Sequence, residues 1–231
     1  MSDAAVELRD IVRSYPGEPR VESLCGVSLR IEPGELLAVV GPSGSGKTTL
    51  LHIVGTLDRP TSGSVRIAGV DTTTMTDAEI SGFRAARLGF VFQQFFLVDG
   101  MNVLDNVAMG LLYRGIEKAA RRRLAAATLE RVGLGHRLAH RPAQLSGGER
   151  QRTAIARSIV GRPALVLADE PTGNLDTAAG AEIVELLHSL NREGTTIVVV
   201  THNREVAAAM HRHIELRDGH IERDTREPIV A

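Results

Sequence analysis

Apolar residues follow two kinds of pattern along most of the chain. Residues 36–40, 164–168 and 195–200 are apolar almost throughout, as is typical of strands buried on both faces of a parallel sheet. Elsewhere apolar residues recur three or four positions apart, which predicts helices at 49–54, 102–112, 118–132, 149–160 and 179–190. Strands that alternate with helices predict an α/β fold built on a mostly parallel, covered sheet.

A second β region is predicted near the N-terminus. Residues 6–12 and 24–31 alternate between apolar and polar positions on either side of turn residues 15–19, so we expect half-exposed antiparallel strands there. Three further β patterns lie at 64–69, at 88–92 and in a predicted hairpin at 214–222.

Helical spacing alone fills the segment 94–160. We therefore predict a single domain over 1–231. In it, 1–92 and 161–231 form the core and the antiparallel β subdomain, and 94–160 forms a helical subdomain.

Between the strand at 36–40 and the next helix, the chain matches G-x-x-x-x-G-K-[ST]. The stretch reads Gly41-Pro42-Ser43-Gly44-Ser45-Gly46-Lys47-Thr48-Thr49. Its glycines let the backbone approach a phosphate, and the helix N-terminus directs unpaired N–H groups at the anion. Lys47 can reach the β- and γ-phosphates, and the Thr48 hydroxyl can bind Mg²⁺. A glycine-rich surface turn is the plainer alternative, but the flanking strand and helix favour a nucleoside triphosphate site.

Two acidic residues, Asp169 and Glu170, directly follow the strand at 164–168. A carboxylate at the end of a strand beside a phosphate loop can hold Mg²⁺, and consecutive strand residues point to opposite sides. We therefore expect Asp169 to face the metal and Glu170 to polarise the water that attacks the γ-phosphate. An acidic helix N-terminus is the alternative interpretation.

The chain contains a second helix N-terminus that could bind an anion, at Leu145-Ser146-Gly147-Gly148-Glu149. Ser146 is a candidate N-cap, and the two glycines leave the backbone N–H groups open to an anion. The Ser-x-x-Glu spacing is also that of a capping box, and both interpretations can hold together.

Composition narrows the class of protein further. With 231 residues, a hydrophobic share of 43% and a net charge of −1, the chain fits one α/β domain, and no nucleic-acid partner is expected. The one cysteine, Cys25, is typical of a reducing cytoplasm. Residues 1–5 lack the features of a signal peptide, and the apolar stretches are far shorter than the ~20 residues of a membrane span. Another chain would have to supply any membrane part.

These motifs, in this order, resemble the nucleotide-binding subunits of the ATP-binding-cassette (ABC) transporters over almost the whole chain. The resemblance implies a RecA-like phosphate-loop NTPase core that hydrolyses ATP with Mg²⁺. In the family, residues 41–48 correspond to the Walker A loop, 165–169 to Walker B and 145–149 to the signature.

Further site residues are implied by the same resemblance. Tyr15 matches the aromatic residue that stacks on adenine, and Gln93 looks like the loop glutamine that contacts Mg²⁺ and the attacking water. His202 is similar to the switch histidine that touches the γ-phosphate, and residues 173–176 resemble the loop that crosses between subunits.

The closer resemblance is to the lipoprotein-release, macrolide-export and cell-division-type subunits, and residues 92–97 and 168–176 carry it. The family implies a head-to-tail pair with a second copy or a paralogous subunit. Each ATP would lie between one phosphate loop and Ser146-Gly147-Gly148-Glu149 of the other subunit.

The resemblance also implies an integral membrane permease that docks near residues 93–112, and a cytoplasmic, peripheral location on the inner face of the cell membrane. Two alternatives remain open at this point. One is an ATP-gated regulator of a membrane complex that moves no solute, and the other is a soluble ABC ATPase outside transport.

Overall fold

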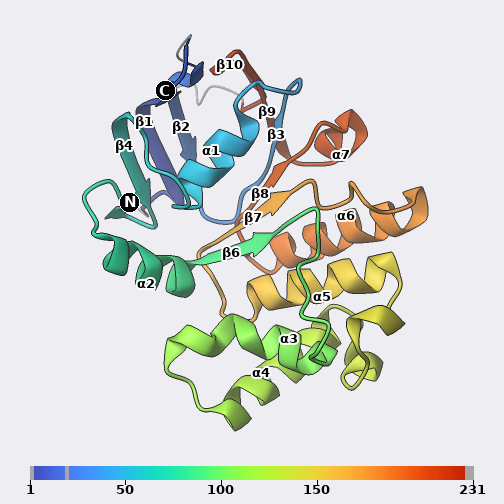
Figure 1. The fold of residues 1–231 in the computed structure, drawn as a ribbon. Helices are drawn as coiled ribbons and strands as arrows, with labels where there is room; N and C mark the ends of the chain where they lie inside the picture. Colours follow the sequence, from blue (N-terminus) through green and yellow to red (C-terminus); the bar gives the residue numbers. More distant parts are fainter. Residues whose placement is uncertain (1–2, 19–20, 227–231) are drawn as a thin grey trace.

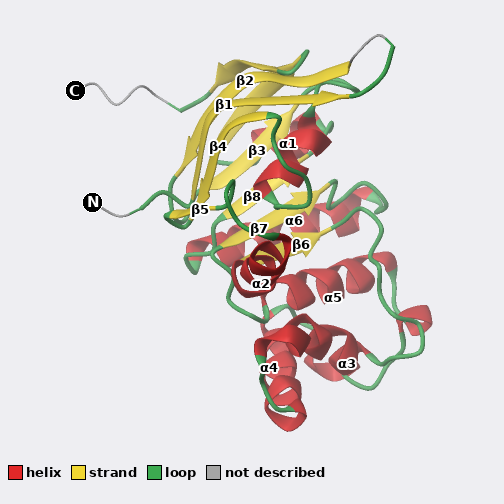
Figure 2. Cartoon of the chain, turned by 60° about the vertical axis from the view of Figure 1, so that its left-hand side comes forward, coloured by secondary structure: helices red, strands yellow, loops and turns green. Residues whose placement is uncertain are grey.

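In the computed structural model, which describes residues 3–18 and 21–226, two sheets lie above a group of helices (Figures 1 and 2). The larger sheet has the strand order β10-β9-β3-β8-β7-β6, and the smaller has the order β2-β1-β4-β5. The strands are β1 Val6–Tyr15, β2 Val21–Ile31, β3 Leu36–Val40, β4 Ser62–Ile67, β5 Val70–Asp71, β6 Leu88–Val91, β7 Leu165–Asp169, β8 Ile197–Val200, β9 Arg212–Arg217 and β10 His220–Asp224.

The larger sheet confirms the predicted α/β class. Its pairs β3–β8, β3–β9, β7–β8 and β6–β7 are parallel, and only the hairpin β9–β10 is antiparallel among the described residues. Parallel strands place their carboxyl ends at one edge of the sheet, so the segments after β3, β7 and β8 come together there.

Alternate residues of the central strands face two separate cores. Leu37 and Val39 pack with the smaller sheet and with the helix that follows the phosphate loop. Leu36, Ala38 and Val40 pack with the helical part of the chain on the other face. Because successive strand residues point to opposite faces, a continuous apolar run is what a strand covered on both sides requires.

The helices occupy two positions around the larger sheet (Figure 1). Helix α1 lies between the two sheets, and α5 and α6 cover the opposite face, with α3 and α4 below them. The helices are α1 Lys47–Val54, α2 Asp77–Arg87, α3 Val103–Ala108, α4 Lys118–Arg131, α5 Gly147–Ile159, α6 Thr177–Arg192 and α7 Arg204–Ala208, with 3₁₀ turns at Met109–Arg114, Gly135–Arg137 and Pro142–Gln144.

Two of these helices were not expected from the sequence pattern. Helix α2 fully buries Ile80 alone, and Phe83 packs partly against the core, so its inward face is short. Its start is nevertheless marked by a capping box, in which Thr76 and Glu79 bond each other's backbone N–H groups. Helix α7 is too short for a periodic pattern. The helix expected at 102–112 divides into α3 and a 3₁₀ turn.

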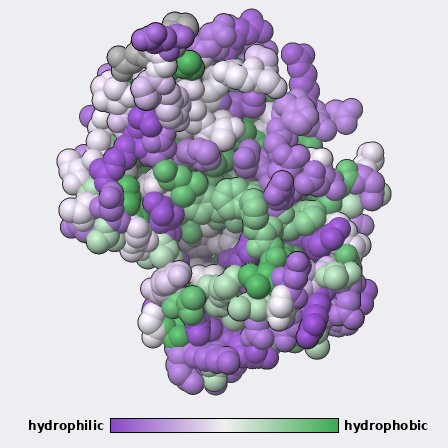
Figure 3. Space-filling model, viewed as in Figure 1, coloured by the Kyte–Doolittle hydropathy of each residue, from purple (hydrophilic) through white to green (hydrophobic). Residues whose placement is uncertain are grey.

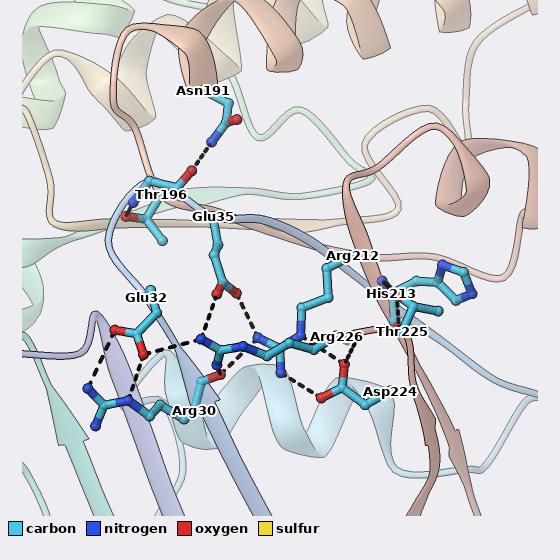
Figure 4. Close-up of polar contacts among 11 residues, drawn as sticks. Arg30, Glu32, Glu35, Asn191, Thr196, Arg212, His213, Asp224, Thr225 and Arg226 are labelled. Atoms are coloured by element: carbon cyan, nitrogen blue, oxygen red, sulfur yellow. Dashed lines mark hydrogen bonds and ion pairs between the residues drawn. The ribbon is translucent and has the colours of Figure 1, made fainter. Parts of the chain in front are cut away.

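A buried guanidinium joins the two sheets at their edge (Figure 4). Arg212 of β9, whose side chain is 9% exposed, donates to Glu35 Oε2 at 2.6 Å and to the Arg30 carbonyl of β2 at 2.9 Å. Its remaining nitrogens bind both carboxylate oxygens of Asp224 in β10. Such bidentate pairing fixes orientation as well as distance, so the small sheet is held against the large one.

Candidate nucleotide site

The phosphate loop connects β3 to α1, and close packing requires its glycines. Gly46, the N-cap of α1, has φ 99°, and a Cβ at this position would lie 2.3 Å from the Ser23 carbonyl oxygen. A Cβ at Gly41 would lie 2.1 Å from the carbonyl oxygen of Leu216. Within the described residues no side chain caps α1. The loop therefore presents a bare helix N-terminus, which suits a phosphate group.

Lys47 spans the loop from the first turn of α1. Its Nζ donates to the carbonyl oxygens of Gly41 at 2.8 Å and Pro42 at 2.7 Å. Burial lowers the pKa of Lys47, while the negative charges of Glu170 and Asp169 act in the opposite direction. The ammonium group therefore lies within the electrostatic influence of both acidic residues.

Other side chains of the loop face different surroundings. Thr48 is exposed on the first turn of α1, whereas Thr49 Oγ1 lies 3.3 Å from Ser23 Oγ of β2. Ser45 Oγ is buried and has no hydrogen-bond partner among the described residues. A buried hydroxyl without a partner in a loop of this shape fits a site that is completed by a polar ligand.

Asp169 is the last residue of β7, at the carboxyl edge of the sheet. Burial and the neighbouring Glu170 raise the pKa of its carboxyl group, and the charges of His52 and Lys47 partly oppose this effect. A partly desolvated carboxylate is a good ligand for a hard cation, since binding the cation offsets the cost of its charge.

Glu170 and His202 lie together at the ends of the neighbouring strands β7 and β8. Glu170 Oε1 is 2.6 Å from His202 Nδ1 and accepts the His202 backbone N–H at 2.8 Å. Its other oxygen accepts from Thr201 Oγ1 at 2.9 Å. Glu170 itself has φ 45°, an unusual value for a residue with a side chain. The sequence predicted Glu170 and His202 for this site but did not assign Thr201 to it.

Gln93, which follows β6, contacts the loop after Glu170. Gln93 Nε2 donates to Asn174 Oδ1 at 3.3 Å, and Asn174 Nδ2 donates to the Gln93 carbonyl at 2.9 Å. A Cβ on Gly173 would lie 2.9 Å from Gln93 Nε2, so the two segments are in close contact. This contact connects the start of the helical part to the edge of the sheet that bears the acidic residues.

Tyr15 ends β1, and its ring is held by two side chains. The hydroxyl donates to Asp58 Oδ2 at 2.8 Å, and the Arg13 guanidinium carbon lies 4.4 Å from the ring centroid. Arg13 Nε also donates to Asp58 Oδ2 at 2.8 Å. The sequence predicted only the tyrosine. Asp58 lies 43 positions away, and no local sequence pattern connects it with Tyr15.

The helix start at Ser146 is a capping box. The Ser146 hydroxyl accepts from the Glu149 N–H at 3.2 Å, and Glu149 Oε2 accepts from the Ser146 N–H at 2.8 Å. Arg137 Nε binds the other carboxylate oxygen at 2.8 Å. The backbone bond to Ser146 contributes most to lowering the pKa of Glu149, and Arg137 adds to it. The carboxylate is thus fully engaged within its own chain.

The two glycine-rich helix starts do not meet within one chain. In Figures 1 and 2 the N-terminal end of α5 is separate from that of α1 in both views. Gly147 and Gly148 instead lie near Leu175 and Ala179, at the start of α6. The α5 terminus therefore lies apart from the phosphate loop of its own chain.

Comparison with known proteins agrees with this geometry. The family profile described as "ABC transporter" matches residues 24–173, and the chain belongs to this family. It is an ATP-binding and ATP-hydrolysing subunit of the ABC type. The resemblance found in the sequence is confirmed.

Particular relatives cover almost the whole chain. An uncharacterized ABC transporter ATP-binding protein of Thermotoga maritima is 48% identical over 97% of each chain. The lipoprotein-releasing system ATP-binding protein LolD of Geobacter metallireducens is 48% identical over 95% of this chain and 98% of its own. The macrolide export ATP-binding/permease protein MacB of Rhodopseudomonas palustris is also 48% identical, but this chain spans only 34% of its length.

Solved structures show the same fold. A dimeric structure of a bacterial ABC transporter cassette has a TM-score of 0.85 at 42% identity, covering 95% of this chain and 97% of that one. A post-hydrolysis dimer bound to ADP and Pi has a TM-score of 0.85 at 41% identity, with the same coverage of both chains. Among the described residues of the present chain, every helix is too short or too polar to cross a bilayer.

Proposed function

We propose that the chain works as a head-to-tail dimer, with a second copy or a paralogous subunit, and drives a separately encoded integral membrane permease. The main observation that supports a dimer is the separation of the two anion-facing helix starts, at α1 and α5, within one chain. Dimeric solved relatives support it. In the proposed dimer each ATP lies between residues 41–49 of one subunit and Ser146-Gly147-Gly148-Glu149 of the other.

Because Glu149 is engaged by Ser146 and Arg137, its part in this interface is to shape the helix start. The phosphate is then bound by backbone N–H groups at the α5 terminus, where the helix dipole favours an anion.

The residues near the phosphate loop divide the chemistry between them. Glu170 polarises the attacking water, and His202 contacts the γ-phosphate. Lys47 binds the β- and γ-phosphates in exchange for its hydrogen bonds to the carbonyl oxygens of Gly41 and Pro42. Tyr15 stacks on adenine.

Mg²⁺ would be held by the Thr48 hydroxyl, the Asp169 carboxylate and the Gln93 amide oxygen. All three are oxygen donors of the kind that this cation prefers. When bound, the ion neutralises charge on the phosphate oxygens.

The permease would dock over a groove where the core meets the helical part. A cavity of about 670 Å³ there is lined by residues that include Phe90, Phe92, Met109 and Tyr113. Tyr113 is 86% exposed, and Figure 3 shows hydrophobic residues gathered across this middle region. A large exposed apolar surface is typical of an interaction site. Docking here, at and near residues 93–112, would place the chain on the inner face of the cell membrane.

The test is Glu170→Gln, which keeps the shape of the side chain and removes its charge. Loss of a general base lowers turnover by about 10²–10⁴-fold, so we expect ATP to remain bound and the dimer to persist. The tagged Glu170→Gln protein is incubated with ATP and used to capture partners from detergent-solubilised native membranes. Lys47→Ala serves as the control, because it is expected to bind ATP much more weakly.

A multi-span membrane protein recovered in near-equal amount with Glu170→Gln, and not with the control, would support the permease proposal. Recovery of the dimer alone, or with ribosomes or DNA, would contradict it. Turnover at the wild-type rate would remove Glu170 from its proposed role.

A further inference from the structure

We infer that Asp58 and Arg13 form a clamp that positions the Tyr15 ring for the nucleotide base and ties it to the phosphate-loop helix. The inference rests on the proposed contact between Tyr15 and adenine. It assigns positioning roles to two residues that lie outside the phosphate loop and outside every motif discussed above.

The clamp fixes the tyrosine in two ways. Asp58 Oδ2 accepts both the Tyr15 hydroxyl and Arg13 Nε, each at 2.8 Å. Arg13 and Tyr15 are two positions apart on β1, so their side chains leave the strand on the same side, and the guanidinium covers one ring face at 4.4 Å. A base can then stack only on the other face.

The charge state of Asp58 suits this role. Burial disfavours its ionised form, but hydrogen bonds from Tyr15 and the Arg59 N–H, together with the charge of Arg13, outweigh burial and lower its pKa. The side chains of Arg13 and Asp58 are each 23% exposed, so water weakens the pair only in part. The anchor is charged throughout the neutral range.

Asp58 is also attached to α1. Its backbone N–H donates to the His52 carbonyl at 3.2 Å, and Thr61 N–H donates to the Val12 carbonyl at 2.7 Å. The segment after α1 is thereby hydrogen-bonded to the end of β1. Because α1 begins at Lys47, one short helix links the phosphate site at its N-terminus to the base platform at its C-terminus.

A ring already held in place loses less freedom when the nucleotide binds, so the clamp should act on affinity and leave the chemical step unchanged. Asp58→Ala is expected to raise the Kd for ATP by up to about tenfold, which corresponds to the cost of ordering one additional side chain on binding. The change in kcat should stay below about twofold, since Asp58 touches none of the groups near the γ-phosphate.

The matched control is Asp77→Ala. Asp77 pairs with Arg59 at 2.9 Å, and its side chain is 97% exposed, so this variant removes a nearby aspartate without touching Tyr15. Its Kd should equal that of the wild type. Asp58→Asn keeps one acceptor oxygen, so its Kd for ATP should lie between those of Asp58→Ala and the wild type. It replaces Asp58→Ala if that variant does not fold.

A double-mutant cycle with Tyr15→Phe isolates the bond itself. Tyr15→Phe retains the ring and removes the hydroxyl. If Asp58 acts through that hydroxyl, Asp58→Ala should cost much less affinity in the Tyr15→Phe protein than in the wild type. Equal costs in both proteins would overturn the clamp.

Tyrosine emission gives a readout that a loss of general stability would not mimic. The chain has no Trp and only two Tyr, so a Tyr113→Phe background leaves Tyr15 as the sole emitter. A phenol bonded to a carboxylate emits weakly, and Asp58→Ala should therefore brighten Tyr15 before ATP is added. Unchanged emission would contradict the bond.

Different variants test the adenine contact and the clamp. If Tyr15→Ala leaves the Kd for ATP unchanged, the adenine contact is wrong. If Tyr15→Ala weakens ATP binding and Asp58→Ala does not, the contact stands and the clamp is wrong.

Discussion

Replacing Arg212 by Met tests whether the buried ion pairs stabilise the joint between the sheets. Arg212→Met retains most of the side-chain volume and removes bonds to Glu35, Asp224 and the Arg30 carbonyl. Removing one partner of a buried pair typically costs about 3–5 kcal/mol. The side chains of Glu35 and Asp224 are 21% and 31% exposed, so water recovers part of that loss. We expect the free energy of unfolding to fall by about 2–3 kcal/mol.

Urea denaturation followed by circular dichroism measures this change, and a thermal melt should show a Tm lower by about 5–10 °C for a chain of this size. Arg217→Met is the control, because Arg217 pairs with Glu222 at 3.5 Å and both side chains are well exposed. That variant should lose less than about 0.5 kcal/mol. A loss below about 1 kcal/mol for Arg212→Met would refute the reasoning.

The same network should make the free energy of unfolding depend on pH in the acid range. Hydrogen bonds from Arg212 and the Arg226 N–H, with the charges of both arginines, outweigh burial and lower the pKa of Asp224. Its stabilisation is therefore complete above the unfolded pKa of about 3.9 and is lost as pH falls through the lower folded value. The gap in stability between wild type and Arg212→Met should narrow over that acid range.

Two further predictions concern the nucleotide site. Lys47→Ala removes the cation that faces the phosphates and should raise the Kd for ATP by about 100-fold in calorimetric titration; unchanged affinity would count against the phosphate-loop assignment. Burial and Glu170 raise the pKa of Asp169 above the ordinary Asp value of about 3.9. As pH falls, Asp169 should therefore become protonated at a higher pH than an ordinary Asp, and the Mg²⁺ concentration needed for half-maximal turnover should rise there. The same dependence in Asp169→Asn, measured over the same pH range, would exclude Asp169 as the titrating ligand.

The sequence predicted what depends on local pattern. The phosphate loop is one example, since Gly46 needs its positive φ of 99° for the turn that the contiguous motif encodes. The buried strands are another, because a sheet covered on both faces needs unbroken apolar runs such as 36–40. Helix α2 was not predicted, because Ile80 is its one fully buried residue, although the Thr76–Glu79 spacing marked its start.

Contacts between distant segments could not be predicted in this way. Thr201 and Asp58 acquire their roles only when the chain brings them to Glu170 and Tyr15, across 31 and 43 positions. Local composition indicates a strand end for Thr201 and a turn for Asp58, and neither pattern specifies a hydrogen-bond partner. His202 was assigned to the site only through resemblance to a family, and its contact with Glu170 was not predicted.

The separation of the α1 and α5 termini has a kinetic consequence for the proposed dimer. A two-fold pair uses both termini of each subunit and leaves no unmatched end, so assembly stops at two copies. In dilute solution the rate of hydrolysis should then grow with the square of protein concentration. A membrane partner that holds two subunits side by side would replace this dependence with a fixed effective concentration. Such a partner could switch the enzyme on without contacting any residue that touches ATP.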